Sequence, residues 1–146
     1  MDNSINNEIL PINEYKGFVL GENISVHLGK KHTVEHFSPT FMSDTYHFID
    51  DDIDVYCSTD GTIETISCSS SFLFNGIELI GLNINEFDEM VQQQEHCDFW
   101  PDEIIETDGV QQFYDRNDYL KLRLQLWYVD DIIKIVRVCS SFWSDD

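Results

Sequence analysis

The chain has 146 residues, of which 42% are hydrophobic and 13% aromatic, enough apolar material for the core of one domain spanning residues 1–146. Its 28 Asp and Glu against 8 Lys and Arg give a formal net charge of −20, and these charges are spread along the whole chain. A surface of this sign repels phosphate backbones and anionic lipids, which excludes direct binding to nucleic acids or membranes, and it attracts basic proteins.

The first residues are polar and acidic, and no stretch approaches the roughly 20 apolar residues that cross a bilayer. We therefore expect a cytoplasmic protein without a signal peptide. In that compartment reduced, mostly buried thiols are expected, with disulfides as the alternative. No C-x-x-C pair occurs among the four cysteines, Cys57, Cys68, Cys97 and Cys139.

In the first half of the chain, short apolar runs are separated by turn residues. Residues 23–29 carry β-branched side chains and predict either a short helix or a strand. Three later runs alternate between apolar and polar residues, or nearly so, and predict strands at residues 46–49, 53–57 and 62–67. The polar residues 58–61 predict the turn between the last two strands.

The second half begins with the clearest helical signal. Asn83 can cap a helix, and Glu86, three residues later, can reach back to the cap. An apolar face then predicts a helix to about Glu95, and this face is formed by Phe87, Met90 and Val91.

The end of the chain predicts a β-hairpin. Residues 121–126 alternate cleanly, which predicts a half-buried strand with one apolar face, formed by Leu122, Leu124 and Leu126. Trp127 and Tyr128 extend this strand. After a turn at Asp130 and Asp131, residues 132–138 form the partner strand, with Lys134 and Arg137 directed outward.

The two halves echo each other. Residues 17–24 resemble residues 76–84, and residues 63–72 resemble residues 133–142. We expect an internal duplication with halves at about 15–73 and 74–142, each a strand, a helix and a meander. The predicted fold is α+β, mostly antiparallel sheet with one or two helices. Charges such as Asp52, Asp54 and Glu64 are expected to protect strand edges.

Motifs for catalysis and cofactor binding are absent from the sequence, so we expect a protein that is not an enzyme and has no cofactor, metal or catalytic residue. There is no phosphate-binding glycine loop, zinc-binding H-E-x-x-H or nucleophile elbow. Residues 95–98 have metal-ligand side chains, but adjacent residues rarely reach one ion, so an exposed helix end is predicted. Residues 50–54 lack the glycine and glutamate of an EF-hand loop and predict a solvated turn.

Residues 99–103 place Trp100 beside Pro101 and several carboxylates, and this composition predicts an acidic loop. An aromatic anchor surrounded by charge is typical of interface hot spots. Packing of Trp100 against the core is an equal alternative. For Phe142, near the end of the chain, core packing is expected.

Residues 74–87 and the closing hairpin at 120–139 resemble small acidic antitoxins of bacterial polymorphic toxin systems, especially the immunity proteins of contact-dependent growth inhibition. The resemblance covers mainly residues 74–142. The duplicated layout is also similar to that of Whirly-like domains. Those domains bind single-stranded DNA through basic and aromatic surfaces, so the 8 basic residues of this chain leave only the scaffold as an expectation.

The resemblance and the charge together predict an immunity protein that binds a cognate basic toxin, a nuclease, and covers its active site or substrate surface. We expect a monomer or a weak dimer. The alternative is an acidic type III secretion chaperone that binds an effector segment and forms a dimer with an apolar groove. The contact surface is expected to be drawn from Asp50, Asp51, Asp52, Asp54, Asp98, Trp100, Asp102, Glu103, Asp130 and Asp131.

Overall fold

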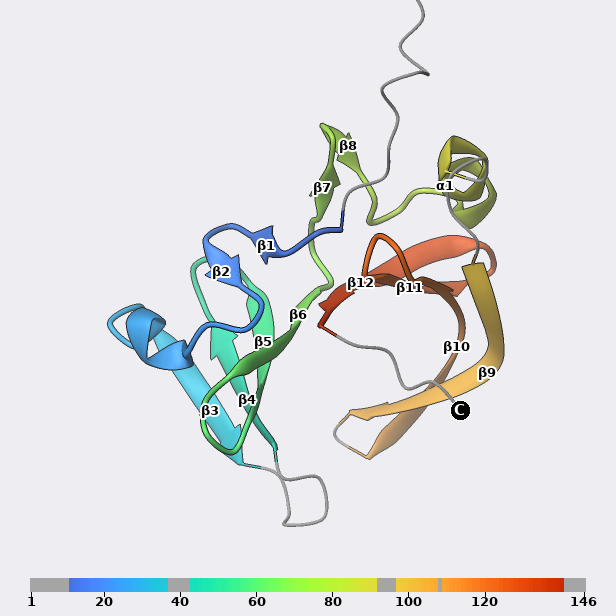
Figure 1. Ribbon diagram of the computed structural model, residues 1–146. Coiled ribbons are helices and arrows are strands. Elements are labelled where there is room, and N and C mark those ends of the chain that lie inside the picture. The colour runs from blue at the N-terminus through green and yellow to red at the C-terminus, as the bar shows by residue number, and fades with distance from the viewer. Residues whose placement is uncertain (1–10, 37–42, 92–96, 108, 141–146) are drawn as a thin grey trace, which may run out of the picture.

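The structure is a computed structural model that describes residues 11–36, 43–91, 97–107 and 109–140. One antiparallel sheet of eight strands dominates it (Figure 1). In order across the sheet, the strands are β3 (His32–His36), β4 (Ser43–Phe48), β5 (Ile53–Ser58), β6 (Ile63–Cys68), β12 (Ile132–Cys139), β11 (Leu124–Val129), β10 (Val110–Tyr119) and β9 (Cys97–Thr107). The prediction of a mostly antiparallel sheet with few helices is therefore confirmed.

Two small hairpins and two helical segments make up the rest of the described structure. The first hairpin pairs β1 (Glu14–Tyr15) with β2 (Phe18–Val19), and the second pairs β7 (Leu73–Phe74) with β8 (Ile77–Glu78). A 3-10 helix at Ile24–His27 follows the first hairpin, and α1 (Ile84–Val91) follows the second. The hairpins and α1 lie along one side of the large sheet (Figure 1).

Asparagine side chains cap both helical segments. Asn83 Oδ1 accepts from the Asn85 N–H at 2.8 Å, which confirms the predicted cap of α1. The described helix ends at Val91, and its predicted continuation to residue 95 lies outside the described residues. Asn23 Oδ1 accepts from the Ser25 N–H at 3.0 Å, so residues 23–29 take the helical alternative. Within the described ranges, no helix has the length and apolar character needed to span a bilayer.

The predicted strand from residue 121 begins three residues later than expected. β11 starts at Leu124, and the preceding residues turn between β10 and β11. Arg123 has a φ of +64°, and its N–H donates to the Leu120 carbonyl at 3.3 Å, which is turn geometry. Leu122 is nevertheless buried, because this turn folds back onto the core. The apolar alternation was therefore a signal of burial along residues 122–126, and of strand only from Leu124.

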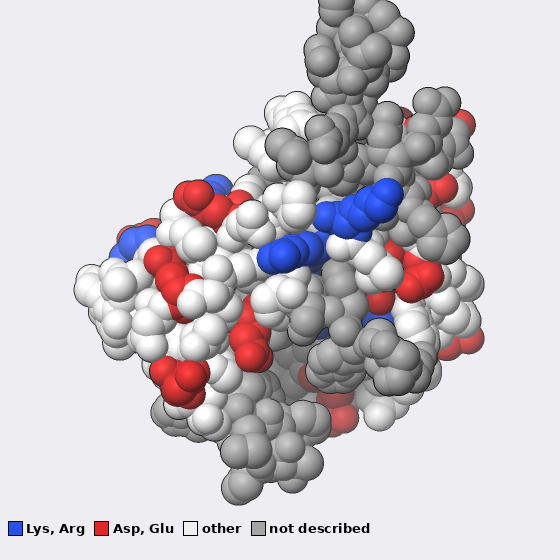
Figure 2. Space-filling model, in the orientation of Figure 1, with Lys and Arg blue, Asp and Glu red and all other residues white. Residues whose placement is uncertain are grey.

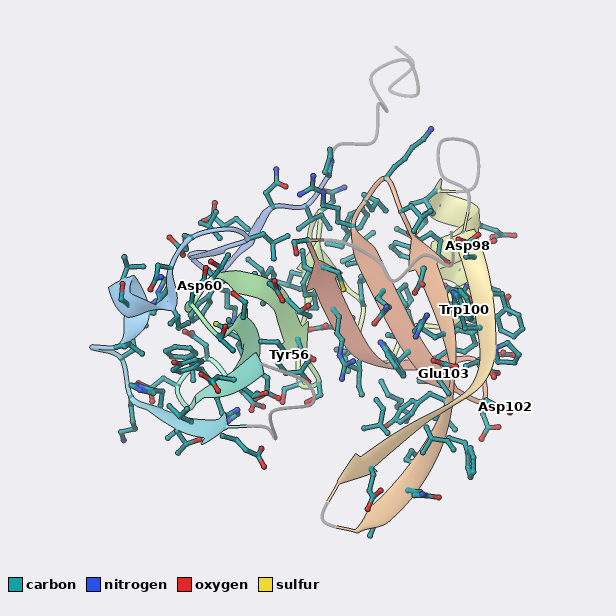
Figure 3. All side chains as sticks on the ribbon, turned by 60° about the horizontal axis from the view of Figure 1, so that its bottom comes forward. Tyr56, Asp60, Asp98, Trp100, Asp102 and Glu103 are labelled. Carbon is teal, nitrogen blue, oxygen red and sulfur yellow. The ribbon has the colours of Figure 1, made fainter. Side chains whose placement is uncertain are left out.

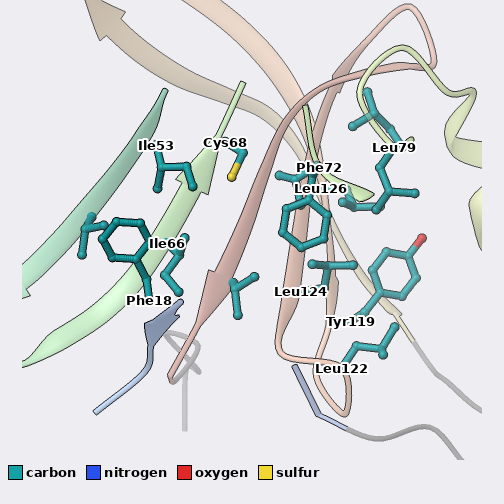
Figure 4. Packing of buried hydrophobic residues seen from close by; sticks show 14 of the residues in the cluster. Phe18, Ile53, Ile66, Cys68, Phe72, Leu79, Tyr119, Leu122, Leu124 and Leu126 are labelled. Atoms are coloured by element: carbon teal, nitrogen blue, oxygen red, sulfur yellow. The ribbon is translucent and has the colours of Figure 1, made fainter. Parts of the chain in front are cut away.

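The core lies between the large sheet and the elements that cover one of its faces (Figure 4). Phe87 of α1 packs edge-on against Phe74 and Tyr119, with ring centroids 5.5 and 5.1 Å apart. Tyr15 stacks on Phe72 at 4.1 Å. These contacts join both hairpins and α1 to a single apolar cluster, which includes Phe18, Ile53, Ile66, Leu79, Leu124 and Leu126.

The two halves of the chain have the same order of elements: a hairpin, a helical segment and a four-stranded meander. Three backbone hydrogen bonds join the start of each helical segment to the last hairpin of its meander. In the first half they run from Gly21 N to Ile63 O, from Ile63 N to Glu22 O and from Ile24 N to Gly61 O. The equivalent bonds of the second half run from Gly81 N to Ile133 O, from Ile133 N to Leu82 O and from Ile84 N to Asp131 O. The register shifts at Tyr56/Cys57 and again at Trp127/Tyr128. At the centre of the sheet, the β6–β12 register is symmetrical about the Ser67–Arg137 pair.

The outer strands of the large sheet are β3 and β9. Asp54 lies in β5 and Glu64 in β6, and each of these strands has a neighbour on both sides. The prediction that these two carboxylates protect strand edges is therefore wrong, because the chain places them in interior strands. Asp52 lies in the turn between β4 and β5. The carboxylates on the outer strands are Glu35 in β3 and those of β9.

Candidate functional site

The two longest strands, β9 and β10, extend beyond the rest of the sheet (Figure 3). They pair with each other from their base to the turn, whereas β11 pairs only with residues 115–119 of β10. Residues 103–107 and 110–114 therefore form a two-stranded ribbon, which we call the arm. In Figure 3 the arm extends beyond the covered part of the sheet.

An extra residue at the base of the arm sets which side chains share a face. Trp100 pairs with Arg116 and Glu103 pairs with Tyr114, so β9 has one more residue than β10 between these pairs. At this bulge Asp102 has a φ of +55°, and its N–H donates to Asp115 Oδ1 at 3.3 Å. Trp100 and Glu103 consequently lie on the same face although three positions separate them.

The segment around Trp100 is therefore a strand, and the prediction of a loop there is wrong. Pro101 misled the prediction, since proline cannot donate to a sheet ladder. It is accommodated because β9 is an edge strand and because Pro101 stands at the bulge. In Figure 3, Asp98, Trp100 and Glu103 follow one another along β9, and Asp102 lies on its outer side.

The arm exposes large apolar side chains. Ile104 and Phe113 are cross-strand partners, and they are 51% and 54% exposed. Phe99, which is 55% exposed, lies on the same face of β9 as Ile104. We call these three residues the apolar patch. Val110, near the tip, is also exposed, on the opposite face of the arm.

The hairpin that carries the apolar patch is acidic along its sequence. Residues 97–115 contain no Lys or Arg, and their acidic residues are Asp98, Asp102, Glu103, Asp108, Glu106 and Asp115. We call residues 97–115 the acidic hairpin. Figure 2 shows acidic side chains scattered over one face of the molecule, with several basic side chains near its middle. The acidic hairpin thus contains no basic residue of its own, and the neighbouring Arg116 pairs with one of its carboxylates, Glu103.

Arg116 anchors the base of the arm. Its guanidinium contacts Glu103 at 2.9 Å and Asp118 at 3.0 Å, and it lies over the rings of Trp100 and Trp127, 5.2 and 5.3 Å from their centroids. Asp118 is buried, and burial raises the pKa of its carboxyl above the ordinary value although the charge of Arg116 acts in the opposite direction. Arg116 thereby holds three strands together.

Arg137 continues the same row towards the first half of the sheet. It lies over Trp127 and Tyr56, with its guanidinium 4.7 and 5.3 Å from the ring centroids. It donates to Ser67 Oγ at 3.3 Å and to the Tyr56 hydroxyl at 3.2 Å. Rings and guanidinium groups therefore alternate across the sheet, and each such contact contributes about 0.5–2 kcal/mol depending on its exposure. This row lies on the face of the sheet opposite the core, and it reaches the base of the arm at Trp100 and Arg116.

The indole nitrogen of Trp100 is unusual within this arrangement. Among the described residues, Trp100 Nε1 is the buried side-chain nitrogen or oxygen for which no hydrogen-bond partner is found. A buried N–H without an acceptor costs about 1–3 kcal/mol. Trp100 is therefore an anchor held by its ring contact with Arg116 and not by its polar group.

The predicted contact residues fall into three groups in the structure. Asp98, Trp100, Asp102 and Glu103 all lie on β9, and they are the predicted residues that the fold brings together with exposed apolar side chains. The second group is at the start of β5, where His47 Nδ1 donates to Asp54 Oδ1 at 2.7 Å and Ser70 donates to Asp52. Asp50 and Asp51 belong to the same β4–β5 turn.

The third group is the β11–β12 turn, formed by Asp130 and Asp131, whose φ values are +51° and +68°. The Asp131 carbonyl accepts from the Ile84 N–H at 2.8 Å, so this turn is bonded to the start of α1. The turn is exposed and carries two charges, which makes it a useful comparison for the charges of the acidic hairpin.

Three buried thiols and the candidate metal ligands can be located in the described part of the chain. Cys57, Cys68 and Cys139 are buried and free. Burial raises the pKa of Cys57 and Cys68 to about 12 and that of Cys139 to about 11, so these thiols stay protonated at neutral pH. In residues 11–36, 43–91, 97–107 and 109–140, no three or more His, Cys, Asp or Glu side chains are grouped so that they could hold a metal ion.

Sequence reasoning missed Arg116, Trp127 and Arg137 as parts of this site. It also missed the arm itself. The available signal was Asp108-Gly109 between two runs of apolar and β-branched residues, since Asp-Gly is a preferred two-residue hairpin turn. Gly109 has a φ of +79°, as such a turn requires.

Comparisons of the chain with protein-family models, curated proteins and solved structures found no match.

Proposed function

We propose that this protein is an immunity protein that binds and neutralises a basic toxin, a nuclease, by covering its active site or substrate surface, and that the acidic hairpin forms the centre of the contact. One observation carries this proposal: the arm projects from the sheet with an exposed apolar patch and without a single basic residue. The protein contributes binding and no reaction.

The arm has the stability and the exposed apolar side chains that are typical of an unoccupied binding surface. A two-stranded ribbon has marginal stability in water when nothing packs against it. Exposed apolar patches on folded proteins mark interaction sites, and aromatic residues in a charged rim are typical hot spots. Phe99, Ile104 and Phe113 would become buried in a complex, and Arg116 already orders the base of the arm for binding.

The charge of the acidic hairpin suits a nuclease. A nuclease binds phosphates through Lys and Arg, and carboxylates can pair with the same side chains and so block substrate binding. Attraction over the remaining acidic surface would raise the association rate by about 10- to 1,000-fold at low salt. Inhibition would therefore combine steric coverage with replacement of the phosphates.

We also propose that the fold arose by internal duplication, with halves at about 15–73 and 74–142, as in the predicted Whirly-like scaffold. The equivalent hydrogen bonds and bulges of the two halves support this. The Glu35–Thr45 pair of β3 and β4 is equivalent to the Trp100–Arg116 pair of β9 and β10. Ten positions separate Glu35 from Thr45, whereas sixteen separate Trp100 from Arg116. The second half is thus six residues longer at the arm, so the arm is one of the parts in which the halves differ.

Co-expression tests the proposed function. The open reading frame immediately upstream, or its C-terminal portion, is expressed with and without this protein. We expect toxicity that only co-expression relieves, and co-purification of the two proteins. A harmless upstream product, or toxicity that persists on co-expression, would contradict the proposal.

Two matched variants locate the contact. Ile104→Thr alters an exposed β-branched residue of the arm. Val26→Thr alters a β-branched residue of the 3-10 helix, and the Val26 side chain is 67% exposed. We expect Ile104→Thr to weaken co-purification and Val26→Thr to leave it unchanged. Equal retention by both variants would place the contact elsewhere than the arm.

A further inference from the structure

We propose that the arm binds its partner by strand addition, taking up an extended basic segment as a further β-strand. This inference rests on the proposed function in that it names the mode of binding of the same site. The chemistry it requires of the partner is a stretch of about five residues in which Lys or Arg stand on both sides of two consecutive apolar, β-branched side chains.

Both long edges of the arm are unpaired within the described residues. β9 is the last strand of the sheet, so its outer edge has no neighbouring strand. On the other side, residues 110–114 of β10 have β9 as their neighbour but do not pair with β11, which begins its pairing at Asp115. In an antiparallel ladder about half of the backbone groups on each edge point away from the existing partner and can accept another strand.

The proline and the backbone bulge that interrupt the edge of β9 lie at the base of the arm. Pro101 and the bulge at Asp102 interrupt the edge of β9 near its base. Beyond them, residues 103–107 pair in unbroken register with residues 110–114, and neither segment contains proline. The regular part of the edge is therefore the part that projects from the sheet.

The alternation of side chains along the arm specifies the occupant. On one face β9 presents Ile104 followed by Glu106, and on the other Glu103 followed by Ile105. Each face thus offers one apolar and one acidic side chain to an added strand. Cross-strand pairs of opposite charge are stabilising and those of like charge are destabilising. A strand with the order basic, apolar, apolar, basic places one basic and one apolar side chain on each face and so matches both.

The same charges disfavour a second copy of the arm as the occupant. Two acidic hairpins placed side by side would set carboxylates against carboxylates, with no Lys or Arg in residues 97–115 to compensate. Acidic side chains on an edge prevent self-association for this reason. Pairing of the edge with a second copy of itself is therefore disfavoured, and pairing with a strand of opposite charge is favoured.

A synthetic peptide tests strand addition independently of any toxin. The probe is Lys-Val-Ile-Lys-Val-Ile-Lys with blocked ends, titrated into the full-length protein while backbone amide signals and their hydrogen exchange are followed by NMR. The control peptide is N-methylated on two consecutive central residues, which removes one donor from each edge of the probe. Charge and side chains are unchanged in the control.

We expect the probe to bind and to slow amide exchange in residues 103–107 or 110–114, and the methylated peptide to bind at least about tenfold more weakly. The substitutions D102N and E106Q together should weaken binding of the probe, whereas D130N and D131N together should not. Equal binding of both peptides, or protection outside the arm, would overturn strand addition. Concentration-dependent dimerisation of the free protein through the arm would also overturn it, because a second copy would then be the occupant.

The two proposals fail in different experiments. Neutralisation of the upstream toxin without peptide-induced protection of the arm would overturn strand addition and leave the immunity function standing. Protection of the arm by the probe, together with a harmless upstream product, would contradict the immunity function while the binding mode stands.

Discussion

Replacing Arg116 with methionine should destabilise the protein strongly, because Arg116 neutralises a buried carboxylate. The Asp118 side chain is 4% exposed and that of Arg116 13%, whereas Glu103 is 33% exposed. Methionine preserves the length and apolar contacts of the side chain but removes its charge and donors. Glu103 can then turn to water, but Asp118 cannot.

The magnitude follows from these exposures. Removing one partner of a buried ion pair costs about 3–5 kcal/mol. The Glu103 contact adds less than about 1 kcal/mol, since it is partly solvated. Asp118 can relieve part of the cost by taking up a proton, which burial already favours by raising its pKa. We therefore expect R116M to lower the free energy of unfolding by about 3 kcal/mol, equivalent to roughly 6–12 °C in melting temperature.

Urea unfolding followed by circular dichroism measures this change. The double variant R116M/D118N also removes the buried charge of Asp118, which R116M leaves without a partner. Its free energy of unfolding should be about 2 kcal/mol higher than that of R116M alone. A loss below about 1 kcal/mol for R116M, or a double variant no more stable than the single one, would contradict this role of Arg116. Both results would mean that Asp118 is solvated and that Arg116 does not order the base of the arm.

Three further predictions concern the rest of the fold. Phe87→Ala should cost about 3–5 kcal/mol in urea unfolding because Phe87 is fully buried, and the exposed Met90→Ala should change stability by less than about 1 kcal/mol. Gly61→Ala should lower the melting temperature more than Gly109→Ala: both glycines have positive φ, but a Cβ at Gly61 would meet a side chain at 3.1 Å and one at Gly109 meets nothing within 4 Å. Burial opposes ionisation of Glu78, but its hydrogen bonds outweigh this and lower the pKa of its carboxyl below 4.5, so its ionised form stabilises the fold above that pH. The stability difference between Glu78→Gln and the unaltered protein should therefore shrink as the pH falls from 5 through the folded pKa, and a difference that stays constant would exclude this linkage.

The sequence was sufficient to predict those elements whose signal is local. Asn83 and the apolar spacing after it predict α1, because capping and helical periodicity depend on residues a few positions apart. Alternation similarly predicts β5, β6 and β12. The start of β11 was misplaced because Leu122 is buried in a turn, and burial alone produces the same alternation as a strand.

The candidate site was predicted only in part because it depends on register between distant strands. The carboxylates of β9 and Trp100 were identified by composition. Trp100 and Glu103 share a face with Arg116 because of the bulge at Asp102, which no local pattern specifies. The row of rings and guanidinium groups likewise requires Trp127 and Arg137 to meet across β11 and β12. The other predicted carboxylates are chemically similar but lie in separate turns, since charge alone does not encode position.

The acidic hairpin is tested most directly as the binding site by measuring how tightly the toxin binds two purified variants. Each variant removes two exposed charges, and the quantity compared is the dissociation constant of its complex with the toxin. D102N/E106Q alters the acidic hairpin, and D130N/D131N alters the turn between β11 and β12. At low salt we predict at least about a tenfold loss of affinity for the first variant and less than about a twofold loss for the second. Equal losses for the two variants, or unchanged affinity of D102N/E106Q, would contradict the claim that the acidic hairpin is the binding site.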